Sequence, residues 1–488
     1  MNIVMITNLS YYLPELALIA AMVLGLFAIA FSGSRDQSDK IVFGLTMLLL
    51  MVSYILLNNM MFAVPRTIFS SALVIDRFGT LFKIIMVIGT IAAIYLGRFS
   101  QDILPEIKSE FSIIVIGVLV GGMLLASANN LLIVYLGVET LSILSYALAS
   151  FNRKNNKSSE AGLKYALYGG ISAGLMLFGM GHIYGVLGTI QFEGIADVLS
   201  GLTLSDISIL LPSFLLFFAG LGYKIATVPF HMWAPDVYEG SPLPVTTFFA
   251  VVPKMAGMAV IMRITMVFFS AEGVLQIGWI GLLSVIAALT MTVGNVAAIG
   301  QRSVKRMLAY SSISHAGVML TGVITLNHLG TTAILFYGVA YLFMTLTAFY
   351  VTTFVADGCE NDHFERFTGL VSRHPLMAIL MSIAMLSLAG IPPFSGFVAK
   401  FNILAALIEK RYFVMAVILG LNSVVSLYYY MKIVRLMVLK SPESSAPVGG
   451  FGLLNQAVIV AFTIPTLVLG LFWQEMMSVA SSASLLVK

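Results

Sequence analysis

The chain has 488 residues, of which 59% are hydrophobic and only 10% are charged. Soluble domains carry about 25% charged residues, so this composition excludes an ordinary soluble protein and indicates a membrane protein. The formal net charge of +4 is small for this length and is spread over many loops, which argues against a nucleic-acid partner.

Fourteen apolar runs follow one another along the chain, and each is long enough to cross a lipid bilayer. A span needs about 20 apolar residues to cross a hydrocarbon core of about 30 Å. The runs are centred near residues 22, 51, 86, 118, 141, 174, 216, 256, 287, 314, 342, 388 to 400, 424 and 464. We therefore expect an all-α polytopic membrane protein with about 14 transmembrane helices and one membrane domain over residues 1–488.

The basic residues outside these runs are divided unequally between the two sets of loops. Loops that follow odd-numbered spans contain fifteen Lys or Arg residues, whereas the even-numbered loops and the C-terminal tail contain five, the last of them Lys488. Cytoplasmic loops of membrane proteins carry the excess of Lys and Arg. We therefore expect both termini on the non-cytoplasmic side of the membrane. The length and the number of spans suit a bacterial inner (plasma) membrane.

Six basic residues fall inside the apolar runs, namely Lys83, Lys164, Lys224, Lys254, Arg263 and Lys400. A charge at the bilayer centre costs about 2.5 to 3.5 kcal/mol on insertion scales, so each one is a functional-site hypothesis unless it reaches water. Lys83 and Arg263 lie toward the outer ends of their spans, where snorkelling of the side chain explains them. Lys224, Lys254 and Lys400 have apolar sequence beside them and no acidic neighbour on their own helix.

Lys164 differs from these three because it follows a polar loop by one turn. Glu160 is its i−4 neighbour, a spacing that supports an ion pair on the helix surface. The spacing is compatible with a structural role and with a functional one.

Glu139 is the one acidic residue in the middle of an apolar run, so its partner must come from another helix. If that partner is Lys224, the carboxylate favours the ammonium while burial favours the neutral amine. Moving the carboxylate would then change the proton affinity of the lysine. The alternative is a static pair that serves helix packing.

Two histidines lie within or beside spans. Imidazole can relay protons near neutral pH, and His315 has Ser311 one turn earlier on the same helix face. A histidine satisfied by ordinary hydrogen bonds is the alternative for His315, and the simpler interpretation of His231.

Two apolar runs are interrupted by proline beside a lysine. Pro229 follows Lys224 in GYKIATVPFHMWAPD, and Pro392 and Pro393 precede Lys400 in LAGIPPFSGFVAKF. Proline inside a helix removes a backbone donor and clashes with the preceding turn. Freed backbone groups are tolerated in a membrane only beside protein or a water-filled cavity. We therefore expect helices 7 and 12 to be broken, with water nearby.

Equal spacings predict an internal repeat. Lys224 and Lys400 are 176 residues apart, and so are Glu139 and His315. Five spans separate the members of each pair, which suggests two copies of one unit, residues 111–271 (helices 4–8) and 275–440 (helices 9–13). An odd number of spans in each copy makes the second copy inverted in the membrane, as in many transporters.

The chain contains a single cysteine, Cys359, whereas an iron–sulfur cluster normally takes four. No cluster of His, Cys or carboxylate residues has the spacing of metal ligands. We therefore expect this chain to bind no metal, to hold no cofactor and to carry no electrons.

Three stretches together resemble the subunit N family of bacterial NADH-quinone oxidoreductase, respiratory complex I. They are VPFHMWAPDVYEGSPLPVTTFFAVVPK at residues 228–254, LAGIPPFSGFVAKF at residues 388–401, and the fifth span with Glu139. The resemblance covers nearly the whole chain. It implies fourteen helices in two inverted five-helix repeats and a chain that translocates protons.

The resemblance also implies partners and site residues. Other subunits, which hold flavin, iron–sulfur clusters and quinone, would oxidise NADH and reduce quinone, and sister antiporter-like subunits would adjoin this chain in the membrane. The residues that it implies for proton translocation are Glu139, Lys164, Lys224, Lys254 and Lys400, with His315 as a relay.

Two other functions are weighed against proton translocation in complex I. A subunit of a multisubunit sodium/proton antiporter would move sodium without NADH. A structural membrane scaffold would use its buried charges only to pair with partner helices. Buried lysines outnumber the one buried acid, which leaves groups free to titrate and favours proton translocation.

Overall fold

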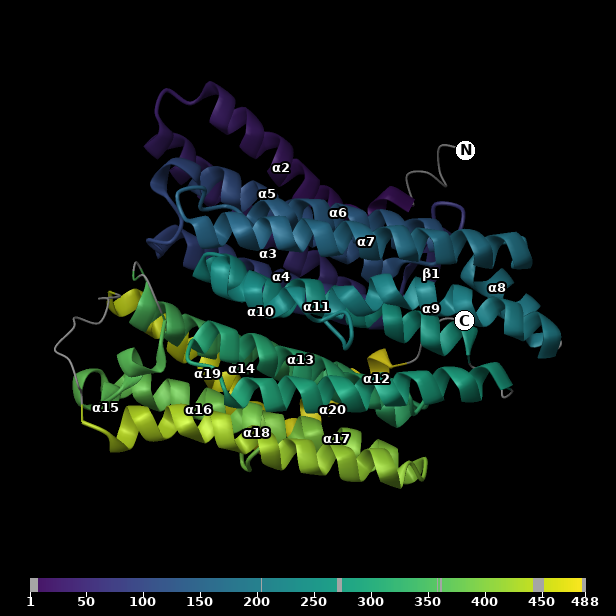
Figure 1. The fold of residues 1–488 in the computed structure, drawn as a ribbon. Helices are drawn as coiled ribbons and strands as arrows, with labels where there is room; N and C mark the ends of the chain where they lie inside the picture. Colours follow the sequence, from purple (N-terminus) through teal and green to yellow (C-terminus); the bar gives the residue numbers. More distant parts are fainter. Residues whose placement is uncertain are drawn as a thin grey trace.

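The computed structural model describes residues 8–202, 204–269, 274–357, 359, 362–441 and 452–484. Its long helices lie side by side with roughly parallel axes (Figure 1). The predicted all-α membrane class is confirmed, because eleven helices of the described chain are long and apolar enough to cross a membrane. They are α2 (Leu13–Phe31), α3 (Arg35–Met60), α4 (Arg77–Phe99), α5 (Lys108–Ser127), α6 (Leu131–Ala149), α7 (Asn156–Leu187), α11 (Leu243–Phe268), α12 (Val274–Ile299), α14 (His328–Ala356), α18 (Phe413–Leu439) and α19 (Leu453–Leu471).

Other elements complete the bundle. Five helices contribute to its interior or to its breaks: α9 (Leu204–Ile225), α10 (Trp233–Gly240), α13 (Val304–Val323), α16 (Pro375–Ala389) and α17 (Ser395–Glu409). The remaining helical pieces are η1 (Pro105–Ile107), α8 (Phe192–Ser200), η2 (Phe364–Phe367), α15 (Leu370–Arg373) and α20 (Trp473–Ala483). A small antiparallel hairpin, β1 (Arg66–Ile68) and β2 (Leu73–Ile75), connects α3 to α4.

Polar residues between the apolar runs set where several helices begin. Ser, Asp and Asn side chains are good N-caps because they accept a hydrogen bond from a backbone N–H that the first turn leaves unpaired. Such caps are Ser34 for α3, Asp76 for α4, Asn130 for α6, Asn155 for α7, Ser303 for α13 and Asn327 for α14. The polar residues between the apolar runs therefore determine where these loops end and the helices begin.

Two helices are interrupted where the sequence has proline beside a lysine. α9 ends at Ile225 and α10 begins at Trp233, with Pro229 in the turn between them. α16 ends at Ala389 and α17 begins at Ser395, with Pro392 and Pro393 between them.

The centre of the bundle is formed by α11 and α14. Almost every residue of both helices is buried, and α11 contacts α4, α5, α9, α13 and α14. Helices α2 and α18 lie at opposite edges of the molecule in Figure 1 and expose many apolar side chains. An apolar edge is expected where a helix faces lipid or a partner subunit.

Two basic residues that were expected to snorkel are instead buried in ion pairs, so that expectation was wrong. Lys83 is 2% exposed, and its Nζ lies 2.6 Å from Oε1 of Glu15 on α2. Arg263 of α11 donates to both carboxylate oxygens of Asp76 at 2.8 and 3.0 Å, and to the Ala126 carbonyl at 2.9 Å. The partner carboxylates come from other helices, which the spacing along one helix cannot show.

We predict that Asp76→Asn destabilises the protein by about 3 to 5 kcal/mol, because it leaves the Arg263 guanidinium buried without a counter-charge. Thermal unfolding of the detergent-solubilised protein measures this loss. Asp36→Asn is the matched control, since Asp36 and Lys40 form an exposed pair at 2.5 Å. The control should change stability by less than about 1 kcal/mol. Equal losses in the two variants would contradict a clamp between α4 and α11.

Candidate functional site

Three lysine amines are buried in the middle of the bundle, on α9, α11 and α17. Lys224 and Lys254 are each 1% exposed, and Lys400 is 8% exposed. Within the described part of the chain, no carboxylate forms an ion pair with any of them. Each amine donates hydrogen bonds to neutral oxygen atoms. These atoms stabilise a positive charge on the amine but carry no negative charge that balances it.

Lys224 lies in the last turn of α9, directly before the break. Its Nζ donates to Oγ of Ser142 on α6 at 2.9 Å and lies 5.7 Å from the ring centroid of Tyr165 on α7. The Tyr165 ring stacks on Trp233 with centroids 4.4 Å apart, and Trp233 donates to the Tyr223 carbonyl at 3.0 Å. The first residue of α10 is thus fixed beside the lysine by an aromatic stack.

Glu139 approaches Lys224 without touching it. It lies three residues before Ser142 on α6, is half-buried, and has one carboxylate oxygen enclosed without a hydrogen-bond partner. The carboxylate and the amine interact electrostatically, but no ion pair joins them. The same helix face carries Leu136 and Ile143, which are exposed to the outside of the chain. Glu139 therefore stands between the buried amine and the outer face of α6.

Lys254 connects the centre of the bundle to α13. Its Nζ donates to Oγ of Ser312 at 2.6 Å and lies 5.9 Å from the ring centroid of Tyr238 on α10. Ser312 in turn donates to the Ala309 carbonyl at 2.7 Å, within its own helix.

His315 is buried one turn after Ser311 and Ser312, and both of its ring nitrogens meet tyrosine hydroxyls. Nδ1 lies 2.5 Å from the hydroxyl of Tyr337 on α14, and Nε2 lies 3.1 Å from that of Tyr430 on α18. The Tyr430 hydroxyl is also hydrogen-bonded to Ser311. The face that the sequence assigned to Ser311 and His315 is therefore bridged by a tyrosine from another helix. Hydroxyl groups donate and accept, so either imidazole tautomer fits.

Lys400 uses backbone atoms that the helix break sets free. Its Nζ donates to the carbonyls of Leu388 and Ala389 at 3.0 and 2.9 Å, at the end of α16. The last carbonyls of a helix have no partner inside the helix. Gly390 follows them with a φ of +86°, which lets the chain turn away tightly.

A small polar cavity lies between His315 and Lys400. Its free volume of about 10 Å³ is near the minimum for one water molecule. The lining residues are Asn295, Ser314, His315, Val318, Lys400, Asn422, Ser423, Ser426, Tyr429 and Tyr430. Such a water would have several hydroxyl and amide partners.

Lys164 belongs to a different environment, an ionic cluster at one end of the bundle. The ion pair with Glu160 that the spacing predicts is present at 2.6 Å, and Asp236 of α10 lies 2.7 Å from the same amine. Arg306 of α13 pairs with Asp236 at 2.7 Å and with Glu239 at 2.9 Å. The cluster links α7, α10 and α13 and surrounds a pocket of about 140 Å³.

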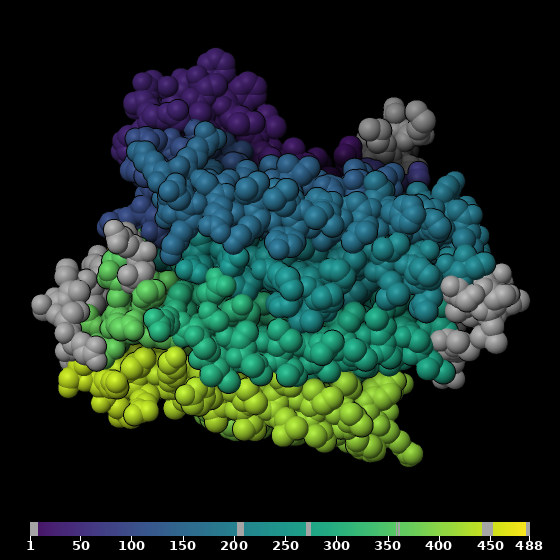
Figure 2. All heavy atoms as spheres, in the orientation of Figure 1, coloured from purple at the N-terminus to yellow at the C-terminus, as the bar shows by residue number. Residues whose placement is uncertain are grey.

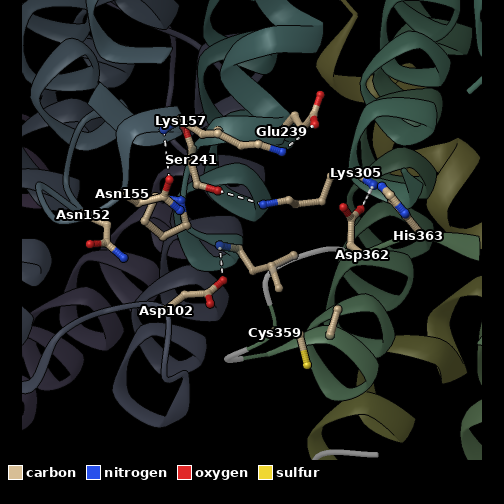
Figure 3. A pocket seen from close by; sticks show the side chains of 14 residues that line it. Asp102, Asn152, Asn155, Lys157, Glu239, Ser241, Lys305, Cys359, Asp362 and His363 are labelled. Atoms are coloured by element: carbon tan, nitrogen blue, oxygen red, sulfur yellow. Dashed lines mark hydrogen bonds and ion pairs between the residues drawn. The ribbon is translucent and has the colours of Figure 1, made fainter. Parts of the chain in front are cut away.

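A second polar pocket adjoins this cluster. Figure 3 shows Lys305 reaching the Ser241 carbonyl, 3.1 Å away, at a pocket of about 70 Å³. Lys157 lines both pockets, and its amine lies 3.4 Å from Oε1 of Glu239. Polar, water-accessible space therefore extends over the ends of α7, α10 and α13.

The sequence did not point to the hydroxyl groups that contact these amines. Ser142 and Ser312, and Tyr430 beside His315, attract no notice by composition, because Ser and Tyr are common in membrane helices. One usable signal is the run YYY at residues 428–430 in the middle of an apolar span. His231 is half-buried in the turn between α9 and α10, away from the hydrogen bonds of His315.

The repeat spacing does not place the two lysines equivalently. Lys224 lies five residues before Pro229, whereas Lys400 lies seven residues after Pro393. The two amines are thus on opposite sides of their breaks, and the equal spacing of 176 residues does not reflect matching positions in the broken helices.

We predict that Gly390→Ala lowers the thermal stability of the protein more than Gly188→Ala does. Both glycines end a helix with positive φ, so each alanine costs about 1 to 2 kcal/mol. A Cβ at Gly390 would lie 2.8 Å from Cδ of Lys400, whereas nothing lies within 4 Å of one at Gly188. Displacing Lys400 from its two carbonyls should add about 1 to 3 kcal/mol. Equal shifts in melting temperature would show that Lys400 is not held tightly.

The chain is similar to known membrane subunits over most of its length. Residues 128–426 match the family model described as NADH:quinone oxidoreductase/Mrp antiporter, TM. NADH-quinone oxidoreductase subunit N 2 of Sorangium cellulosum (strain So ce56) is 38% identical, with 99% of this chain and 98% of that protein covered. Subunit N of Trichlorobacter lovleyi (strain ATCC BAA-1151 / DSM 17278 / SZ) is 41% identical, with 77% of each covered.

Solved structures share the fold. A chain of respiratory complex I from Thermus thermophilus with bound aureothin has a TM-score of 0.82 and 29% identity, covering 96% of this chain and 100% of its own length. A chain of the Mrp complex from Dietzia sp. DQ12-45-1b has a TM-score of 0.84 at 21% identity, covering 98% and 97%. The second likeness concerns the fold alone.

Proposed function

Because the chain belongs to the NADH:quinone oxidoreductase/Mrp antiporter family of membrane subunits, we propose that it translocates protons as subunit N of a bacterial NADH-quinone oxidoreductase. The observation that carries this proposal is the set of three buried amines that form no ion pair with a carboxylate of the described residues. An amine in such a place can gain and lose a proton, because burial opposes its charge and hydrogen bonds favour it.

In the first half of the proposed path, Lys224 takes a proton from water on the cytoplasmic side. The polar pockets around Lys164 and Lys157 support this route, since Lys164 is followed along α7 by Tyr165, which faces Lys224. Glu139 sets the proton affinity of Lys224 electrostatically. We propose that Lys164 acts at the mouth of the path, held in place by Glu160 and Asp236.

In the second half, Lys254 passes the proton toward Lys400, which releases it outside. Ser312, His315 and Tyr430 supply groups that both donate and accept, and the water-sized cavity adjoins His315 and Lys400. The Lys254–Ser312 and His315–Tyr430 contacts are of hydrogen-bond length, and the cavity can hold one water, which are the distances that a single proton transfer requires.

We further propose fourteen crossings in two inverted repeats, residues 111–271 and 275–440. The eleven long apolar helices, α13 and the two interrupted pairs α9/α10 and α16/α17 together support that number. Residue 271, where the first repeat would end, lies outside the described residues. Each repeat would have one broken helix in its fourth place, α9/α10 in the first repeat and α16/α17 in the second.

Location and partners follow from the same proposal. The unequal distribution of Lys and Arg supports both termini on the non-cytoplasmic side of the bacterial inner membrane, although Lys488 lies outside the described residues. Other subunits would hold flavin, iron–sulfur clusters and quinone and would drive this chain by conformational or electrostatic change. Sister antiporter-like subunits in the membrane arm are the expected neighbours.

We predict that Lys224→Ala and Glu139→Ala each lower the rate of NADH-driven proton pumping by the assembled complex by about tenfold or more, because a titrating group or its modulator is lost. Proton uptake by inverted membrane vesicles measures this, with the amount of assembled complex quantified in parallel. Lys410→Gln, at an exposed position between α17 and α18, is the control and should pump normally. Normal pumping by the Lys224 variant would refute the proposed path.

The rival functions give different results in the same vesicles. A sodium/proton antiporter subunit would exchange sodium for protons without NADH, and the Lys224 variant would lose that exchange. A scaffold would lose assembly of the complex in the Lys254→Ala and Lys400→Ala variants, while the complex that does assemble would pump normally.

The second half of the path has its own test. Tyr430→Phe removes the hydroxyl shared by His315 and Ser311, and we predict a two- to tenfold lower pumping rate, roughly the value of one hydrogen bond. Tyr428→Phe is the matched control, because Tyr428 lies two residues away with 63% of its surface exposed. If both variants pump alike, the proton does not pass through Tyr430.

A further inference from the structure

The outer face of α18 carries a groove that the proton path does not use. It has a volume of about 800 Å³, and all of its lining residues belong to α18 or to its C-cap residue, Lys440. Helix α18 forms the yellow-green edge of the molecule in Figures 1 and 2, at the side opposite α2. The groove is therefore open toward whatever adjoins this edge.

The two ends of the groove differ in chemistry. One end is lined by Val424, Leu427, Tyr428 and Met431 and carries no charge. The other end carries three cations, Lys432, Arg435 and Lys440, together with Leu436 and Leu439. No carboxylate lines the groove, and none pairs with these three cations in the described part of the chain. An anion is the complementary ligand for the basic end.

Lys432 is held at the groove rather than left to move freely. Its Nζ donates to the Gln301 carbonyl at 3.4 Å and lies 4.7 Å from the ring centroid of Phe364 in η2. Arg435 and Lys440 are exposed one and two turns further on. A fixed ammonium beside a free guanidinium can hold a phosphate, since the planar guanidinium matches two phosphate oxygens at once.

The part of the groove between Val424 and Arg435 matches the thickness of one leaflet of a bilayer. Val424 and Arg435 are eleven residues apart, which corresponds to about 16 Å along a helix. Half of a hydrocarbon core of about 30 Å is about 15 Å. With the basic end at the level of the headgroups, the apolar end thus reaches the middle of the membrane.

We propose that this groove is a binding site for one anionic phospholipid. The phosphate lies among Lys432, Arg435 and Lys440, and an acyl chain follows α18 past Met431 and Tyr428 to Val424. A partner helix would cover the apolar end without using the three cations at the other, whereas an anionic lipid contacts both ends. The site does not depend on whether this chain pumps protons.

A photoreactive probe in the groove tests the proposal in the assembled complex. Tyr428 is replaced by p-benzoylphenylalanine, and the complex is placed in nanodiscs of equal parts phosphatidylglycerol and phosphatidylcholine with the same acyl chains. Mass spectrometry then identifies what has become attached to α18 after illumination. We expect phosphatidylglycerol adducts to exceed phosphatidylcholine adducts.

Charge variants establish that the basic end causes this preference. Arg435→Gln and Lys440→Gln should each lower the ratio of the two adducts by about fivefold, whereas Arg435→Lys should largely preserve it. Lys410→Gln, at the opposite end of α18, is the control and should leave the ratio unchanged. A ratio of one without any charge substitution, a ratio insensitive to Arg435 and Lys440, or attachment to another protein chain would overturn the proposal.

Discussion

Whether a buried cation contacts a carboxylate or neutral oxygen atoms decides what it can do in this protein. Arg263 and Lys83 meet carboxylates at hydrogen-bond distance, so their charges are fixed and join helices α4, α11 and α2. Lys254 and Lys400 meet only neutral oxygens, a serine hydroxyl for one and two carbonyls for the other. Among the described residues no carboxylate would be left without its counter-charge if either amine lost a proton, and the proposed proton transfer needs such a site.

For Lys400, the break between α16 and α17 supplies the neutral oxygens. An unbroken helix would use the carbonyls of Leu388 and Ala389 internally, and a lysine beside them would have no acceptor in the membrane. The interruption at Pro392 supplies the acceptors, and the lysine supplies the donor that the freed carbonyls need. The buried amine and the freed carbonyls serve as hydrogen-bond partners for each other. Lys400 and the break between α16 and α17 therefore occur together.

Periodicity and residue type predicted what depends on one helix, and they failed where a second helix was needed. The depth of Lys254 and the break at Pro229 could be derived from the sequence, as could the Glu160–Lys164 pair. The partner of Lys83 could not, because Glu15 lies 68 residues away on α2. Proline was also an incomplete guide, since Pro253 lies inside α11 without ending it.

The position of a lysine within an apolar run does not by itself assign it a role. The lysines of α7 and α9 show this. Lys164 and Lys224 both fall in apolar runs, yet Lys164 is 37% exposed among carboxylates while Lys224 is sealed behind Tyr165. An exposed amine between two carboxylates stays charged and organises its surroundings, whereas an enclosed amine beside a hydroxyl is sensitive to distant charge. Glu139 is near enough to act electrostatically on Lys224 but forms no ion pair with it, and the proposed control of the proton affinity of Lys224 relies on this separation. A shift of the carboxylate would change the field at the amine without breaking a contact, so little free energy is spent on the rearrangement itself.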